Sequence, residues 1–175
     1  MSAHNRFTKE LRERWLSFMQ TSHPEIDPLA ARLFDDFRVI AHQIHQLSEN
    51  SLDSSGLSYA QYRVLMNLRF CEWDGKCDGL NPSEISASQG TSRNTISSLI
   101  RSLEEGGYIE RQLDSDDRRR FNIHLSDAGR NLAYEHEHQH FQLIADLFSA
   151  LSPQEIETLS ALLHKLSDQI STLKE

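Results

Sequence analysis

Arg118 and Arg119 belong to a run of three arginines in the stretch LDSDDRRRFNIHL of this 175-residue chain. Aspartates precede the run, and apolar residues alternate with polar ones after it. Guanidinium groups bind phosphates and base edges through paired hydrogen bonds, and a neighbouring carboxylate can hold such a group in one direction. We therefore predict that Arg118 and Arg119, aimed by Asp117, form a recognition point at the tip of a β-hairpin. The alternative is a hairpin stapled by its own ion pairs.

A second polar set precedes this hairpin in the stretch TSRNTISSLIRSLEEGG. Apolar residues recur there at 96, 99, 100 and 103, and this spacing predicts a helix with one buried face. The residues on the outward side and at the helix start are Ser92, Arg93, Asn94, Thr95, Ser97, Ser98 and Arg101. Side chains of these types contact base edges and phosphates, so we predict that the helix binds double-stranded DNA. The alternative is a solvated helix face.

The neighbouring elements are those that place a recognition helix on DNA. Asn81, Pro82 and Glu84 form a helix-start signature, which predicts a short helix over 82–89 that ends at Gly90. The segments 108–113 and 120–125 read as strands flanking the arginine turn. A short helix, a turn, a second helix and a hairpin in this order indicate a winged helix-turn-helix.

Helical spacing also predicts flanking helices over about 6–20, 28–48, 58–70, 126–150 and 153 to the end. The predicted fold is mostly α with a small β-hairpin. It divides into N-terminal dimerisation helices at 1–56, a winged helix-turn-helix DNA-binding lobe at 57–125 and C-terminal dimerisation helices at 126–175. The last helix carries an apolar seam at Ile156, Leu159, Leu163, Leu166, Ile170 and Leu173. This 3-4 spacing favours a partner helix and therefore a homodimer, with packing inside one subunit as the alternative.

Charge limits the kind of DNA binding that is possible. The formal net charge is −8, and residues 82–120 hold six arginines against seven acidic residues. Bulk positive charge is therefore excluded as the source of affinity, which must come from the placement of single side chains. The chain shows no apolar run of membrane-spanning length and no signal-peptide pattern, so we expect a cytoplasmic protein without a membrane partner. It also lacks phosphate loops and catalytic triads, so we expect neither an enzyme nor a cofactor.

Several of these marks together resemble the MarR family of bacterial transcription regulators. They are the stretch LSYAQYRVLMNL, the segment Leu103-Glu104-Glu105-Gly106-Gly107, the wing motif Asp117-Arg118-Arg119 and the segment Leu125-Ser126-x-x-Gly129. The resemblance implies a homodimeric repressor whose recognition helices enter successive major grooves of a pseudo-palindromic operator. It also implies that the wing arginine, best matched by Arg119, enters the minor groove. A winged helix that binds a protein instead of DNA is the alternative from another functional class.

The family resemblance further implies a small aromatic or anionic effector. The helix bearing Trp15 is similar to the extra N-terminal helix of the urate-responsive subfamily, although Arg63 and Phe70 stand where that subfamily has its ligand-binding acid and arginine. Trp15, His42, His45 and Arg63 are the candidate effector residues. For Trp15 the alternative is helix packing, and for the three cations it is a solvated or packing role.

Two further groups of residues have chemistry of their own. Cys71 and Cys77 flank the predicted loop before the helix-turn-helix, where a thiol pair would act as a redox switch. Inert cysteines are the alternative. His136 and His140 lie four residues apart on one predicted helix, a spacing that can hold a metal when a further ligand is present. We expect instead polar decoration of an exposed helix and no metal site.

Overall fold

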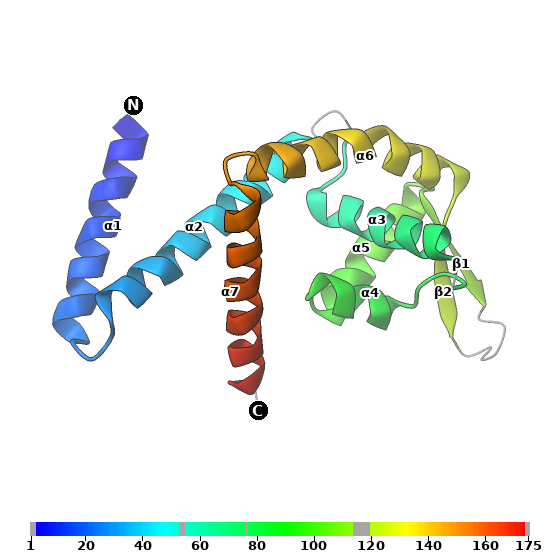
Figure 1. Cartoon of the computed structure of the whole chain (residues 1–175). Coiled ribbons are helices and arrows are strands. Elements are labelled where there is room, and N and C mark those ends of the chain that lie inside the picture. Colours follow the sequence, from blue (N-terminus) through cyan, green and yellow to red (C-terminus); the bar gives the residue numbers. More distant parts are fainter. Residues whose placement is uncertain (1–2, 53–54, 76, 114–119, 174–175) are drawn as a thin grey trace. The chain divides into compact units, whose positions relative to one another are not determined.

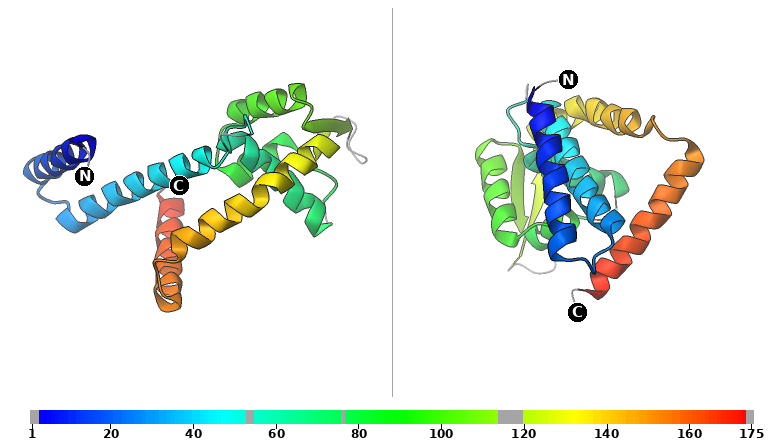
Figure 2. Two further views of the ribbon diagram at one scale, coloured as in Figure 1. Left: turned by 90° about the horizontal axis from the view of Figure 1, so that it is seen from above. Right: turned by 90° about the vertical axis from the view of Figure 1, so that its left-hand side faces the viewer.

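The computed structural model describes residues 3–52, 55–75, 77–113 and 120–173. Its contacts divide the chain into two compact units, Met1–Leu47 and Ser48–Glu175. The first unit holds α1 (Ala3–Ser22) and most of α2 (Pro28–Asn50), which form a helical hairpin (Figure 2). As predicted, α2 begins after Asp27, whose carboxylate accepts a hydrogen bond from the Leu29 amide at 2.9 Å.

The second unit carries the helix-turn-helix and the hairpin (Figure 1). Its elements are α3 (Tyr59–Asp74), α4 (Pro82–Gln89), α5 (Arg93–Glu105), β1 (Ile109–Leu113), β2 (Phe121–Leu125), α6 (Asp127–Phe148) and α7 (Pro153–Thr172). The two strands pair antiparallel, with Ile109 opposite Leu125 and Leu113 opposite Phe121. The prediction of a mostly helical chain with one small hairpin is confirmed.

Local sequence signals set most of the helix starts. Ser58 caps α3 in a reciprocal capping box with Gln61, and Asn81 caps α4 in the same way with Glu84, where a helix start was predicted. Gly90 follows α4 at φ 62°, a left-handed conformation that glycine adopts without a steric penalty. The turn between α4 and α5 therefore forms where the sequence places it.

One apolar core holds the winged-helix lobe together. Leu65 and Leu68 of α3 meet Ile96 and Ile100 of α5, and strand β2 adds Ile123. All five are at most 2% exposed. Their burial fixes the orientation of α5, because the helix must turn this apolar stripe inward and its polar stripe outward.

The end of α3 differs from the prediction. The helix continues to Asp74 instead of ending at about residue 70, so Cys71 lies in its last turn and is buried rather than in a loop. Gly75, at φ 65°, ends the helix and donates its amide hydrogen to the Cys71 carbonyl. The helix thus runs about one turn beyond the sequence pattern, and this turn contains the buried Cys71.

The last helix, α7, is not packed into the core. None of the described residues of α7 is buried, and the predicted seam is exposed at Leu163, Leu166 and Ile170. None of the helices in the described ranges combines the length and the apolar content that crossing a bilayer requires.

Candidate nucleic-acid interface

The outward face of α5 is the surface that the helix-turn-helix presents. The structure exposes every side chain that the sequence assigned to it: Ser92, Arg93, Asn94, Thr95, Ser97, Ser98 and Arg101. Ser92 is the N-cap of α5, so its side chain accepts from the Thr95 amide at 3.2 Å. The first amides of a helix are left without intrahelical partners and attract phosphate.

Hydrogen bonds within the helix sort these side chains by what they can still donate. The hydroxyl of Ser97 donates to the Arg93 carbonyl at 2.9 Å, and that of Ser98 donates to the Asn94 carbonyl at 3.2 Å. Ser92 and Thr95 share a hydrogen bond between their hydroxyls at 2.9 Å. In contrast, no residue in the described ranges pairs with the side chains of Arg93, Asn94 or Arg101. These three side chains are therefore available to donate hydrogen bonds to a ligand on the outward face of α5.

The base of the wing is braced by an ion pair. Arg111 of β1 lies 2.9 Å from the Glu104 carboxylate at the end of α5, so that arginine supports the wing instead of facing outward freely. Asp117, Arg118 and Arg119 lie outside the described residues, and their assignment as the groove-reading tip remains a prediction.

The loop before α4 adds an anchor that the sequence did not indicate. Leu80 pairs with Ile123 of β2 through two backbone hydrogen bonds of 3.1 and 2.9 Å. Gly79, at φ 74°, lies so close to the wing that a β-carbon there would be 2.8 Å from the Ile123 carbonyl oxygen. The wing and the start of α4 are therefore tied to one short segment of backbone.

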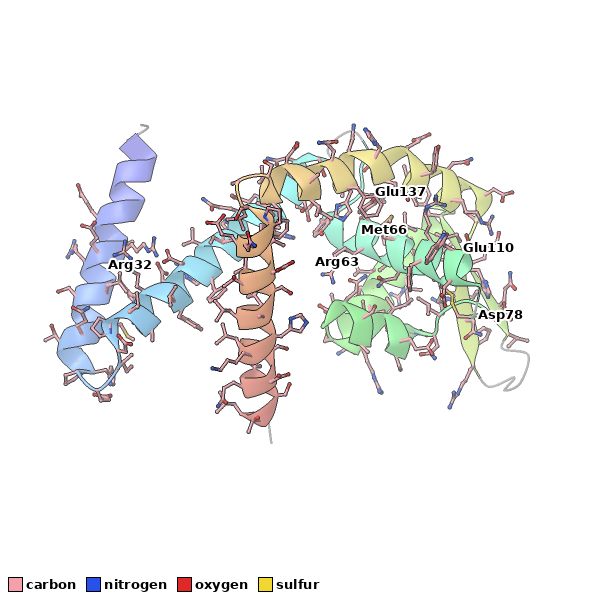
Figure 3. All side chains as sticks on the ribbon, in the orientation of Figure 1. Arg32, Arg63, Met66, Asp78, Glu110 and Glu137 are labelled. Atoms are coloured by element: carbon pink, nitrogen blue, oxygen red, sulfur yellow. A yellow bond between two sulfur atoms is a disulfide. The ribbon has the colours of Figure 1, made fainter. Side chains whose placement is uncertain are left out.

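The candidate effector residues of the first unit do not share one cavity. Trp15 lines a cavity of about 330 Å³ within the α1–α2 hairpin, together with Leu11, Arg12, Phe34, Asp35, Arg38 and Val39. His42 and His45 lie on exposed positions of α2, and neither lines this cavity. Arg63 is exposed on α3, on the side away from α6 (Figure 3).

The charged residues of the Trp15 cavity are ones that the sequence did not single out. Asp35 is 4% exposed and is paired with Arg12 and with Arg38, the latter at 3.0 Å. Arg12 also pairs with Asp36, and this hydrogen bond raises the pKa of the Arg12 guanidinium. The sequence shows two adjacent aspartates at 35–36. Their pairing with Arg12 depends on the packing of α1 on α2.

A second cavity, of about 460 Å³, lies between α3 and α6. Its lining combines aromatic rings with paired charges: Met66, Arg69, Phe70, Glu72, Trp73, Glu137 and Phe141. Arg69 binds Glu137 at 2.8 Å and lies over the Tyr134 ring at 5.5 Å from its centre. Figure 3 labels Met66 and Glu137 between the two helices. No local pattern in the sequence indicates this site, because its members are spread over residues 66–141.

The histidine pair on α6 has a different environment from the one expected. His136 is 8% exposed, so the expectation of an exposed polar pair is wrong for this residue. Its ring meets the buried Tyr62 ring at 6.5 Å, and His140 meets it at 5.4 Å, both edge to face. Within the described ranges no group of three or more His, Cys, Asp or Glu side chains is arranged to hold a metal.

The cysteines are joined rather than separate. Cys71 and Cys77 form a disulfide, with their Cα atoms 5.7 Å apart. The bond runs from the last turn of α3 to the loop that carries Leu80. A scaffold role for cysteine was not expected from the sequence, because two residues so close along the chain give no sign of their state.

Comparisons with known proteins agree with this geometry. A family model described as MarR family matches residues 55–120, which cover the segment from before α3 to the wing. The transcriptional repressor MprA of Escherichia coli (strain K12) is 26% identical over 166 residues, 93% of this chain and 90% of that protein. The HTH-type transcriptional repressor YetL of Bacillus subtilis is 25% identical over 159 residues, 89% of this chain and 93% of the relative.

Solved structures give the same result for the fold. The MepR–DNA complex of S. aureus matches with a TM-score of 0.70 at 29% identity, covering 76% of this chain and 94% of that one. The transcriptional regulator SlyA matches in fold with a TM-score of 0.68, over 80% of this chain and 94% of its own. The likenesses to MprA, YetL and MepR identify a transcription regulator rather than an enzyme.

Proposed function

Because the chain belongs to the MarR family of winged helix-turn-helix DNA-binding regulators, we propose that it is a homodimeric repressor of a pseudo-palindromic DNA operator. The observation that carries the proposal is the outward face of α5, where Arg93, Asn94 and Arg101 are exposed and have no partner among the described residues. Arginine donates to guanine and to phosphate, and asparagine donates to and accepts from adenine. The solved MepR structure is a complex with DNA, which supports DNA binding by this chain as well.

The proposed division of labour follows the expected regions. Residues 57–125 contact DNA, and the helices in 1–56 and 126–175 join two copies. A two-fold dimer of recognition helices requires half-sites about 10 bp apart, which is one turn of the duplex. Blocking polymerase at such a site gives repression. Operator binding takes place in the cytoplasm, where the chromosome lies.

Release by a small aromatic or anionic effector belongs to the same proposal. The Trp15 cavity offers an aromatic wall and two arginines, Arg12 and Arg38, of which Arg38 keeps most of its side chain exposed. His42, His45 and Arg63 stay candidates for effector contacts. An effector that binds the dimerisation region better in one arrangement of the two DNA-binding lobes shifts the dimer away from the operator.

The experiment starts with selection of genomic DNA fragments by the purified protein, read out by sequencing. We expect enrichment of a pseudo-palindrome with half-sites one turn apart. Lack of any enriched sequence from a protein shown to be dimeric, in the presence and in the absence of reductant, would contradict DNA recognition and favour a protein partner for the winged helix.

The enriched operator then tests the wing. Arg119→Ala should weaken operator binding by about 1–3 kcal/mol and reduce the salt dependence, because one groove contact and its released counterion are lost. Arg32→Ala removes an exposed arginine on α2, outside the winged-helix lobe, and should leave the affinity unchanged. Equal affinities of the Arg119→Ala and wild-type proteins in a salt titration would refute the role of the wing arginine.

A further inference from the structure

The disulfide lies at the point where α3, the wing and α4 meet. Cys71 is in the last turn of α3 and is 3% exposed, whereas Cys77 is exposed in the loop that follows. The bond therefore joins a residue fixed in the apolar core to a residue on the surface. Asp78, the next residue along the chain, lies beside the wing strands (Figure 3).

The residues directly after Cys77 connect two parts of the candidate DNA-binding surface. Leu80 makes both of its backbone hydrogen bonds to Ile123 in the wing. Asn81, the next residue, caps α4 by accepting from the Ser83 and Glu84 amides at 2.9 and 3.1 Å. A constraint on Cys77 is therefore transmitted to the wing and to the first helix of the helix-turn-helix within four residues.

The unequal exposure of the two sulfurs fits a reversible reaction. A low-molecular-weight disulfide, RSSR, can be attacked by the exposed Cys77 thiolate, which forms a mixed disulfide and releases one thiol, RSH, once the leaving thiolate is protonated. The Cys71 thiolate then attacks the Cys77 sulfur and releases the second RSH. Two protein thiols are oxidised, one RSSR is reduced, and the two thiol protons end on the two RSH molecules.

We propose that Cys71 and Cys77 form a reversible redox site, in which a low-molecular-weight disulfide closes the bond that fixes the α3–α4 loop against the wing and thereby strengthens DNA binding. The direction of the effect rests on the proposed function and on the oxidised structure, which holds the α4 cap, the Leu80–Ile123 pairing and the core complete. In the cytosol, low-molecular-weight thiols and thioredoxin keep most cysteines reduced. A disulfide in a DNA-binding protein of this compartment is therefore expected to be transient.

Reduction frees the segment from Cys77 to Leu80 from its link to α3. Without the cross-link, the loop samples more conformations, and ordering it on DNA costs more free energy. The tie between α4 and the wing weakens, although the apolar core that holds α5 stays intact. The expected result is a looser wing on an intact lobe, and hence a weaker grip on the operator.

The test compares the full-length protein equilibrated with glutathione disulfide and with dithiothreitol, using the operator found by selection. The oxidised protein should bind at least about fivefold more tightly than the reduced protein, the lower range of measured couplings between sites. Cys77→Ser should bind like the reduced protein under both conditions. The control is Asp78→Ser, which introduces serine at the next position along the chain. This variant should keep the full redox response.

A second measurement reports on the loop without DNA. Hydrogen exchange at the Leu80 and Ile123 amides should be faster after reduction, because these amides make the pairing that the disulfide supports. The Tyr108 amide, which donates to the Leu103 carbonyl at 2.9 Å, serves as the reference and should not change.

The outcomes separate the two proposals. Operator affinities of the oxidised and reduced proteins within twofold of each other, or tighter binding by the reduced protein, would overturn the redox site. So would a Cys77→Ser protein that still responds to dithiothreitol. If neither form binds any DNA, the proposed function fails and the exchange data decide the redox coupling alone: equal protection of Leu80 and Ile123 in both states would refute it.

Discussion

Tyr62, His136 and His140 meet where α3 packs on α6. Tyr62 is 1% exposed, and burial raises the pKa of its phenol above the ordinary value of 10. Burial lowers the pKa of His140 below 6.5, since a charged imidazole loses hydration between the two helices. Burial therefore favours the neutral forms of Tyr62 and His140 at the contact between α3 and α6.

Acidification should weaken the fold through His140. Because its pKa is lower in the folded protein, the unfolded chain takes up a proton first as the pH falls through 6.5. The contribution of a neutral His140 is complete above this pH and is lost below it. Urea unfolding at a series of pH values should show a fall in the free energy of unfolding below pH 6.5, and the fall should be shallower in His140→Gln.

The matched control for this pH series is His138→Gln. His138 lies on the same helix but is exposed, so its replacement should leave the pH dependence as in the wild type. A His140→Gln protein with the same pH dependence as the wild type would contradict this account.

At the scale of elements, the start of α6 is fitted closely to the turn that precedes β1. The Ser126 hydroxyl donates to the Gly107 carbonyl at 2.7 Å, and the Ser126 amide donates to the Tyr108 carbonyl at 3.1 Å. Gly129 packs on the same turn, and a β-carbon there would lie 2.0 Å from the Tyr108 oxygen. The glycine is thus required for the close approach of α6 to the winged-helix lobe.

Gly129→Ala should destabilise the protein, although alanine is the better helix former. A gain in helix propensity of about 1 kcal/mol is expected from the exchange in isolation. The clash with backbone reverses the sign, and overpacking of this kind costs about 1–3 kcal/mol or more. Chemical denaturation of the two proteins measures the difference.

Asn131→Ala is the control on the same helix, at an exposed position two residues further on. It should change the free energy of unfolding by no more than about 0.5 kcal/mol. Stabilisation by Gly129→Ala, in line with propensity alone, would show that α6 does not need this close contact.

For the whole molecule, the exposed apolar side chains of the helices outside the lobe need cover. Phe34, Phe37 and Ile40 of α2 are exposed, as are Leu163 and Leu166 of α7. Large apolar surfaces of this kind mark sites of association in water. A second copy of the chain covers them in the proposed dimer.

Leu163→Glu should separate the dimer. The substitution places a charge in the middle of the α7 seam, where burial against a partner helix would remove it from water. Sedimentation at several concentrations should show monomers at concentrations where the wild type is dimeric. Operator binding should fall with it, because one copy reaches one half-site.

Ala161→Glu introduces the same charge on the opposite face of α7 and is the control. It should stay dimeric and bind the operator as the wild type does. A dimeric Leu163→Glu protein would mean that the seam serves another purpose than self-association.

The sequence by itself determined the elements and their order. The capping serines and Asn81, the 3.6-residue spacing in α5 and the alternation in β2 are signals within a few residues of one another, and the chain obeys them wherever no distant contact competes. The exposed face of α5 follows from the same spacing. The aimed arginine at the wing tip, Arg119, rests on sequence alone and remains a prediction.

Tertiary structure decided what depends on residues far apart along the chain. The burial of His136, the pairing of Leu80 with Ile123, the closeness of Gly129 to Tyr108 and the cavity at Trp15 all arise when one element packs on another. A side chain's exposure and the partner of a charge are properties of such contacts, and no local pattern encodes them. The state of Cys71 and Cys77 belongs to the same group, because it depends on one further turn of α3 held in place by the core.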